Sequence, residues 1–464
     1  MTYNSRKVFE VIEEIASTSS KNEKIAILGN HVHDSLLQQV LRAALDPTIS
    51  YGVTGIKGRD ITGSVDDAGA EFDANTWHVI NRLAGRTLTG NEAQTEIAKE
   101  VNRLDAESSQ LFARILNKDL RAGFSESTVN KVKPGLIPEF AYMRCSLPKA
   151  AKLDQWDWAA GVFSQEKADG MFVNVDHYED GTIAIRSRQG SPFDPLKFPG
   201  VAAIVRGHTK PGYQLHGEML VIGPDGKVLP REQGNGVLNS VLNGGDFEDG
   251  QLPMMVAWDQ VPLSKAVPKG KCETPYSERF ANLCDQLAGM KEHGAACVPI
   301  DTRIVHSLDE AYAHYRELLA LGKEGTIIKA PTAIWKDGTS KEQVKLKLEV
   351  DVDLVSTEIV PGRVGTKNEG RAGSITMVSS CGQLKVDVTI KNETLRDQVD
   401  ANPGAFIGKV WAVRANSIMA PAENDDSYSL FLPRMVEAGY RTDKSEADSL
   451  QSIRDQFDAA VKAA

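Results

Sequence analysis

One segment, VFSQEKADGMFVNVDHY at residues 162–178, constrains the fold more than any other stretch of the chain. An apolar run leads into the turn-forming residues Ala168-Asp169-Gly170, and a run with alternating side chains follows. One face of that run holds Val173, Val175 and His177, and the other holds Phe172, Asn174 and Asp176. This pattern predicts a strand, a tight turn and a second strand, with Lys167 at the mouth of the turn.

A chain of 464 residues is too long for one ordinary core, so we expect two or three domains. Residues 1–122 carry mostly helical patterns, with apolar residues at three- and four-residue spacing in 92–104 and 108–123. Gly123 is expected to end the second of these helices, and Ser125 or Ser127 to cap the next. The Pro- and Gly-containing stretch KVKPGLIPEF, residues 131–140, is the first expected domain boundary.

The pattern changes after about residue 150. We expect strands at 171–178, 182–187, 213–222, 254–258, 325–330 and 343–348, and helices at 276–291 and 307–321. Beyond EVDVDLVSTEIVPG, short β runs separated by turn residues predict a small barrel or sandwich. A polar tail, residues 444–464, is expected to be helical.

Composition narrows the class of protein. The chain is 41% hydrophobic and 25% charged, and no apolar run approaches the ~20 residues that cross a bilayer. The N-terminal stretch reads as an amphipathic helix and not as a signal peptide. Five scattered cysteines without a C-x-x-C pair argue against a zinc site or disulfides and fit a reducing cytoplasm. The formal charge of −10 does not exclude a nucleic-acid partner, because local patches bind phosphate.

Two interpretations of Lys167 are possible. A single K-x-D-G pattern is weak evidence, and a surface lysine beside an Asp-Gly turn would explain it. A nucleophilic lysine must lose its proton, which burial and neighbouring cations favour. Lys345 and Lys347 in QVKLKLEV could be those cations, since residues two apart in a strand point to the same face. A solvated edge strand is the competing reading of that lysine pair.

Two acidic residues stand at or in apolar strands. Glu218 lies within YQLHGEMLVIG, and Glu324 precedes GTIIKA. A carboxylate in such a place needs a partner, typically a metal ion or a hydroxyl, although each residue alone reads more simply as a charge facing water. Arg188 and Trp258 are unremarkable in isolation, and Trp258 would by default belong to the core.

The order of the motifs decides between these readings. K-A-D-G, S-R-x-G, G-E, W-D, E-G-x-x-x-K, K-x-K and finally RTDK (441–444) follow one another over more than half of the chain. In this the chain resembles the covalent nucleotidyltransferase superfamily and, within it, the ATP-dependent DNA ligases, most closely the type carried by T-even bacteriophages. Stretches outside the motifs resemble that group too, among them NKDLRAGFSESTVNKVKPGLIPE and SLFLP.

The resemblance implies a multidomain α+β fold. It implies a helical DNA-binding domain at 1–135 and a mixed α/β, antiparallel-sheet nucleotidyltransferase (ATP-grasp-like ligase) domain at 145–348. An OB-fold β-barrel with a helical tail would occupy 350–464. The implied partner is nicked double-stranded DNA, bound by a monomer without membrane association, in the bacterial host cytoplasm if the source is a phage.

The resemblance also implies roles for single residues. Lys167 would attack the α-phosphate of ATP and form a lysine–AMP intermediate. Glu218 and Glu324 would contact ribose and a catalytic Mg²⁺ or Mn²⁺. The other nucleotide-binding positions implied are Gln165 at the purine edge with Glu166 beside it, Arg188, the stacking Trp258, Lys329, and the phosphate-binding pair Lys345 and Lys347.

The resemblance also implies roles for two further groups of residues. Arg441, Asp443 and Lys444 match a motif of the C-terminal barrel that orients the leaving pyrophosphate when the barrel closes. In the helical region, basic residues near a Gly-containing turn would bind DNA phosphates, namely Arg114, Lys118, Arg121, Lys131 and Lys133.

The chain departs from the family pattern at two places. Phe172 stands where relatives usually carry an arginine, and His216 where aspartate is commoner. An RNA ligase or another covalent nucleotidyltransferase, such as a capping guanylyltransferase, is the main alternative. The absence of a four-cysteine module disfavours an NAD-dependent ligase. A non-catalytic nucleic-acid-binding protein would not need the lysines and carboxylates together.

Overall fold

A computed structural model describes residues 4–61, 69–290, 296–421 and 426–463. The chain forms two compact units, residues 1–139 with 350–454, and residues 140–349 with 455–464. The domain expected at 1–135 includes residues 62–68, which lie outside the described residues. No helix in the described ranges is both long enough and apolar enough to cross a membrane.

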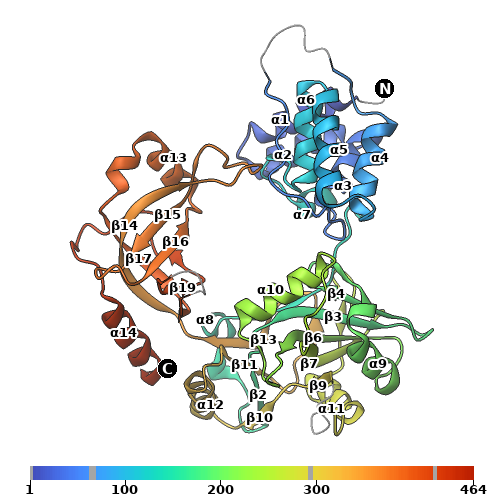
Figure 1. The fold of residues 1–464 in the computed structure, drawn as a ribbon. Coiled ribbons are helices and arrows are strands. Elements are labelled where there is room, and N and C mark those ends of the chain that lie inside the picture. The colour runs from blue at the N-terminus through green and yellow to red at the C-terminus, as the bar shows by residue number, and fades with distance from the viewer. Residues whose placement is uncertain (1–3, 62–68, 291–295, 422–425, 464) are drawn as a thin grey trace. The chain divides into compact units, whose positions relative to one another are not determined.

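The N-terminal region is helical (Figure 1). Its helices are α1 (Ser5–Ala16), α2 (Lys21–His31), α3 (Ser35–Leu45), α4 (Ala74–Ala84), α5 (Gly90–Arg103), α6 (Ala106–Leu116) and α7 (Glu126–Val132). Their apolar faces meet in one core that includes Ile12, Leu41 and Phe112. The expectation that a helix reaches Gly123 is wrong: α6 ends at Leu116, because Lys118 and Arg121 adopt a left-handed φ of 57°.

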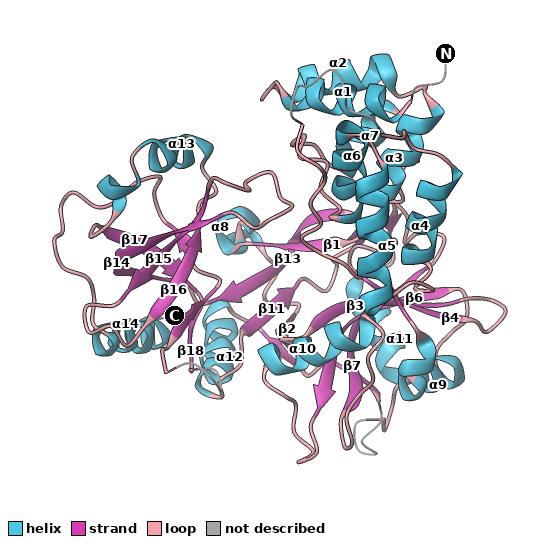
Figure 2. Ribbon diagram, turned by 45° about the horizontal axis from the view of Figure 1, so that its top comes forward, coloured by secondary structure: helices cyan, strands magenta, loops and turns pink. Residues whose placement is uncertain are grey.

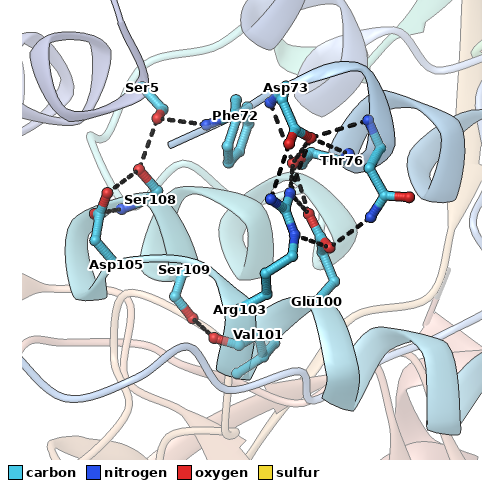
Figure 3. A network of polar contacts seen from close by, with 11 residues as sticks. Ser5, Phe72, Asp73, Thr76, Glu100, Val101, Arg103, Asp105, Ser108 and Ser109 are labelled. Carbon is cyan, nitrogen blue, oxygen red and sulfur yellow. Dashed lines mark hydrogen bonds and ion pairs between the residues drawn. The ribbon is translucent and has the colours of Figure 1, made fainter. Parts of the chain in front are cut away.

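A polar network joins four of these helices (Figure 3). Asp73 caps α4 through a capping box with Thr76, and both oxygens of its carboxylate accept from Arg103 at 2.9 Å. Arg103, at the end of α5, also donates to Glu100 at 2.8 Å. Ser5 at the start of α1 lies 2.6 Å from Ser108 of α6. Charge-assisted hydrogen bonds therefore tie the start of α4 to the end of α5.

The second unit is built on two sheets (Figure 2). The five-stranded sheet has the order β1-β13-β11-β2-β10 and the six-stranded sheet the order β5-β4-β3-β6-β7-β9. The strands of the first are β1 (Met143–Ser146), β2 (Val162–Glu166), β10 (Thr302–Val305), β11 (Gly325–Lys329) and β13 (Gly338–Lys347). Those of the second are β3 (Met171–His177), β4 (Ile183–Ser187), β5 (Pro192–Phe193), β6 (Tyr213–Ile222), β7 (Leu252–Pro262) and β9 (Cys297–Pro299). A short pair, β8 (Lys271–Cys272) and β12 (Trp335–Lys336), completes the strands.

Helices cover these sheets. Helices α9 (Pro199–His208) and α11 (Tyr276–Gln286) pack on the six-stranded sheet, and α12 (Leu308–Ala320) packs on the five-stranded one. The remaining helices of the unit are α8 (Pro148–Ala151) and α10 (Arg231–Leu242). The core between α9, α11 and the larger sheet contains the fully buried Val173 and Val175. The alternation predicted after Lys167 is therefore confirmed for the apolar face of β3.

All six strands expected in this region exist; β6 has the expected bounds, and the other five have shifted ends. Strand β7 extends to 252–262 and β13 begins at Gly338, because both continue into pairings that the short apolar runs did not reveal. Helix α11 ends at Gln286 and not at 291, a residue outside the described ranges. Most pairs are antiparallel as expected, but β1–β13 and β7–β9 are parallel.

The region after residue 350 is rich in strands. A five-stranded sheet of order β16-β15-β14-β17-β20 curves as a half-barrel, and a separate pair, β18-β19, accompanies it (Figure 1). The strands are β14 (Val350–Pro361), β15 (Ala372–Val378), β16 (Lys385–Thr389), β17 (Val410–Ala415), β18 (Ser417–Met419), β19 (Ser429–Phe431) and β20 (Arg434–Met435). Helix α13 spans Glu393–Ala401. The tail is helical only from Leu450, as α14 (Leu450–Ala463), so the predicted start at 444 is wrong.

Candidate active site

A cavity of about 460 Å³ opens in the second unit where its two sheets face each other. Cys145, Gln165 and Lys329 line it from the five-stranded sheet. Phe172, Glu218 and Trp258 line it from the six-stranded sheet. Polar and apolar side chains thus alternate around one concave site, as in pockets that orient a small molecule.

The register of the five-stranded sheet explains which lysines face the cavity. Gln165 is paired with Ile327, and Ile327 with Lys345, so these three side chains share one face. One row further, Lys347 is paired with Gly325, whose carbonyl oxygen accepts from the Lys167 backbone N–H at 2.9 Å. Lys345 and Lys347 therefore lie on the cavity face of β13. Lys347 also forms an ion pair with Glu349 at 2.6 Å.

Lys167 stands directly after β2 at the cavity wall, and its ammonium group forms an ion pair with Glu324. The Glu324 side chain is 13% exposed, and this burial raises its pKa in spite of the neighbouring Lys167. Arg231, the first residue of α10, lies 3.7 Å from the Glu324 carboxylate and pairs with Asp169 of the turn. The site thus holds two cations and two carboxylates in mutual contact.

Glu218 enters from the opposite sheet, where it is paired with Phe172 in register. Burial raises the pKa of its carboxyl group to about 7. The Gly170 N–H donates to Glu218 at 3.2 Å, which connects the turn to the second sheet. A Cβ at Gly170 would lie 2.3 Å from the carbonyl oxygen of Met219, so only glycine allows this approach.

Trp258 sits at a bulge of β7. His216 of β6 pairs with Asp259, but the next residue, Gly217, pairs with Ala257, so Trp258 is the extra residue. A bulge of this kind lets two consecutive side chains point to the same face, which a regular strand forbids. Trp258 reaches the cavity, and Asp259 beside it forms a buried ion pair with Arg279 at 2.8 Å.

Phe172, where the resemblance leads us to expect an arginine, belongs to an aromatic wall of the cavity. The Phe172 ring lies 4.9 Å from that of Tyr142 and 5.7 Å from that of Trp258. The exposed Arg188 lines the same cavity, with its guanidinium carbon 5.4 Å from the centre of the Tyr142 ring. His216 is buried and shares a 3.0 Å hydrogen bond with Gln214.

Gln165 and Lys329 meet at a side chain that the sequence analysis did not single out. The hydroxyl of Tyr276 accepts from Gln165 at 2.7 Å and from Lys329 at 3.2 Å. Burial lowers the pKa of Lys329 to about 8. Glu166 also lines the cavity and forms an ion pair with Lys323 at 2.9 Å.

Sequence reasoning missed four residues of the site: Tyr142, Asp169, Arg231 and Tyr276. Asp169 was visible in the turn motif but was read only as a turn former. Tyr276 and Arg231 begin helices α11 and α10, distant in sequence from every motif. No local pattern distinguishes such residues from ordinary helix starts.

The RTDK segment lies on the β-rich region and contacts its own sheet. Arg441 donates to Asp353 of β14 at 3.1 Å and to Asp443 at 3.0 Å. Lys444 also pairs with Asp353, whose side chain is 7% exposed. The lysine of this motif is therefore held by a buried carboxylate, while Asp443, with its pKa lowered to about 2 by Arg441, remains exposed.

The five basic residues suggested for DNA contact divide into two groups. Arg114 is buried and bonds Glu13 at 2.5 Å, and Lys118 donates to the carbonyl of Ala43 at 3.1 Å. Both side chains therefore stabilise the helical bundle from inside, whereas the resemblance had implied that they contact DNA phosphates. Arg121 is half-buried, Lys133 is half-buried and Lys131 is exposed.

No group of three or more His, Cys, Asp or Glu side chains in the described part of the chain is arranged to hold a metal ion. Two carboxylates, Glu218 and Glu324, do face the site. One or two carboxylates together with substrate phosphates are a usual set of Mg²⁺ ligands, so the residues present fit an ion that a nucleotide helps to bind.

The lysine at the mouth of this cavity lies within a segment that matches a known family model. Residues 152–347 match the family model described as the ATP dependent DNA ligase domain. Over these residues the chain is similar to ATP-dependent DNA ligases.

Relatives extend the likeness beyond that domain. The DNA ligases of Enterobacteria phages T4 and T6 are each 27% identical over 97% of this chain and 99% of their own length. The solved structure Pmar-Lig_PreS3 shares the fold with a TM-score of 0.72 at 19% identity, over 94% of this chain and 99% of that one. These matches are to DNA ligases, so the RNA ligase alternative is not favoured.

Proposed function

We propose that this enzyme seals nicks in double-stranded DNA, joining a 3′-hydroxyl to a 5′-phosphate at the expense of ATP. The observation that carries the proposal is Lys167, paired with Glu324 at a cavity whose other wall offers Glu218 and Trp258. This combination supplies a nucleophile, two carboxylates and an aromatic ring around one site.

The first step forms a lysine–AMP intermediate. Lys167 Nζ attacks the α-phosphorus of ATP, the bond to the β-phosphate oxygen breaks, and pyrophosphate leaves. The adenylyl group then passes to the 5′-phosphate of the nick, which restores the lysine. Attack by the 3′-hydroxyl closes the backbone and releases AMP.

The other residues of the cavity would bind the nucleotide. Lys345 and Lys347, on the same face as Lys167, would neutralise the α-phosphate and stabilise the charge of the transition state. Trp258 would stack on the adenine, and Arg188 at the rim would contact the ribose and phosphate. The other positions assigned to the nucleotide are Gln165, Glu166 and Lys329.

Glu218 and Glu324 would hold a Mg²⁺ or Mn²⁺ ion with the phosphates. Such an ion neutralises phosphate charge when bound. The ammonium group of Lys167 forms an ion pair with Glu324, so Lys167 must leave this carboxylate before it can attack.

The rest of the chain would supply DNA binding and closure. We assign residues 1–135 to DNA binding, 145–348 to adenylylation and 350–464 to an OB-fold domain with its tail. Lys131 and Lys133, with Arg121, are the residues assigned to phosphate contact, and Arg441, Asp443 and Lys444 those assigned to the leaving pyrophosphate. The enzyme would act as a monomer in the cytoplasm.

The test is to incubate the purified protein with α-labelled ATP or GTP and then with nicked DNA. A covalent AMP adduct is expected with ATP, and Lys167→Ala should abolish it together with sealing, because this substitution removes the proposed nucleophile. A slow sealing of pre-adenylylated nicks should survive in that variant. The exposed Lys149→Ala is the matched control. Full ATP-dependent sealing by Lys167→Ala, or labelling by GTP instead of ATP, would contradict the proposal.

A further inference from the structure

The side-chain amide of Gln165 has a fixed polarity, which its neighbours impose. Gln165 is 1% exposed and lines the cavity. Its Nε2 group lies 2.7 Å from the Tyr276 hydroxyl and 3.0 Å from the Thr302 hydroxyl. An amide has one donor end and one acceptor end, so the hydrogens of its neighbours decide which end faces where.

Tyr276 can only accept from Gln165. Its single hydroxyl hydrogen is donated to the carbonyl oxygen of Trp258 at 2.8 Å, and a carbonyl cannot donate in return. The Lys329 ammonium, a pure donor, approaches the same oxygen at 3.2 Å. The oxygen of this fully buried tyrosine therefore gives one hydrogen bond and receives two.

Thr302 repeats the arrangement. Its hydroxyl donates to the carbonyl oxygen of Ile300 at 3.0 Å, so it too accepts from Gln165. Both hydrogens of the Gln165 amide are thereby used. Within the described part of the chain no donor reaches Gln165 Oε1, which leaves this oxygen to the contents of the cavity.

We propose that Tyr276 is a positioning residue that holds the Gln165 amide with its oxygen toward the bound base, and that this polarity selects a 6-amino purine over a 6-oxo purine. The inference rests on the proposed binding of ATP in this cavity. Adenine offers an N–H donor at its 6-position, which Oε1 accepts. Hypoxanthine and guanine offer an oxygen there, so two acceptors would face each other without water between them.

The first experiment measures lysine–AMP or lysine–IMP formation by the full-length protein with α-labelled ATP and ITP. Tyr276→Phe keeps the ring but removes the acceptor, so the amide gains freedom to turn its NH₂ group toward a 6-oxo base. The ratio of kcat/KM for ATP to that for ITP is expected to fall about tenfold or more. Tyr312→Phe removes a hydroxyl from α12 of the same unit and is the matched control, with an unchanged ratio.

The double variant Gln165→Glu, Tyr276→Phe supplies a rescue. A carboxylate presents an oxygen in either rotation, so the preference for ATP should return although Tyr276 is still absent. A merely structural role of Tyr276 would slow both nucleotides alike and leave the ratio unchanged. That result, or a double variant that discriminates no better than Tyr276→Phe, would overturn the proposal.

A measurement on the unaltered protein covers the case in which Tyr276→Phe fails to fold. Purine riboside triphosphate lacks the 6-substituent, so it loses the hydrogen bond but meets no repulsion. A fixed Oε1 predicts the order ATP, then purine riboside triphosphate, then ITP. A freely turning amide would serve ITP at least as well as purine riboside triphosphate, and that order would refute the inference. If ATP itself gives no adduct, the proposed function fails first, which keeps the two failures distinguishable.

Discussion

Substitution of Arg279 by alanine should destabilise the second unit strongly and in a pH-dependent way. Arg279 of α11 bonds Asp259 through two nitrogens at 2.8 Å each, and both side chains are almost fully buried, at 3% and 1% exposed. The same guanidinium also donates to the Ala333 carbonyl at 3.1 Å. Asp259 directly follows Trp258, so this pair fixes the strand that carries the aromatic residue of the site.

The magnitude follows from what the substitution leaves behind. Arg279→Ala removes one partner of a buried pair and strands the Asp259 carboxylate in the interior, which typically costs about 3–5 kcal/mol. A domain is stable by about 5–15 kcal/mol in total, so the loss should shift the denaturation midpoint visibly. Replacing both residues with leucine should cost much less than either single change, because no charge is then left unpaired.

The destabilisation caused by Arg279→Ala should depend on pH. Burial alone would raise the pKa of Asp259, but Arg279 holds it below its usual range, so in the native protein this pair loses its stabilising effect only in strong acid. Without Arg279, burial dominates and the folded-state pKa lies above the unfolded value. The destabilisation is then full at alkaline pH and declines as the pH falls toward that unfolded value, by up to about 1.4 kcal/mol per pH unit.

The assay is urea denaturation at pH 8 and pH 5, together with hydrogen exchange of β7 and α11 to assign the loss to this unit. The KM for ATP of the variant should rise, since Trp258 is less firmly held. A loss below about 1 kcal/mol at pH 8, or a loss that is the same at both pH values, would refute the argument. Asn282→Ala, at an exposed position of α11, is the control for changes in helix propensity.

Two further predictions concern the other regions. Lys444→Ala should slow formation of the lysine–AMP adduct by about 100-fold but cost much less in sealing a pre-adenylylated nick, because no pyrophosphate leaves there; equal losses in both rates would contradict this. The exchange Lys131→Glu, Lys133→Glu should weaken binding of nicked DNA and reduce the salt dependence of log Kd by about 2, with adduct formation intact. Unchanged affinity and slope would remove both lysines from the DNA contact.

Much of the fold was accessible from local sequence patterns. The alternation around Val173 and Val175 predicted a strand, which β3 confirms. The two-residue spacing of Lys345 and Lys347 predicted a shared face, which the register of β13 and β11 confirms. These predictions rest on the period of a strand, which any neighbouring element leaves unchanged.

Features that depend on neighbours were not accessible. The turn at Lys118 and Arg121 ends α6 early, although the apolar spacing continues to Gly123. Lys118 reads as a surface cation, yet it donates into the bundle, and burial lowers its pKa to about 8. Tyr276 belongs to the site because α11 lies beside β2 and β11. Its contact with Gln165 of β2 joins segments more than a hundred residues apart, which no local sequence pattern reveals.

The bulge at Trp258 limits how this domain can change in length. Deletion of either Trp258 or Asp259 would let β6 and β7 pair without interruption. The bulge places two side chains where regular pairing has one, so the shortened strand would lack either the indole ring or the carboxylate bound by Arg279. A loss of one residue at the centre of this strand therefore removes either the aromatic side chain of the cavity or the buried ion pair beside it.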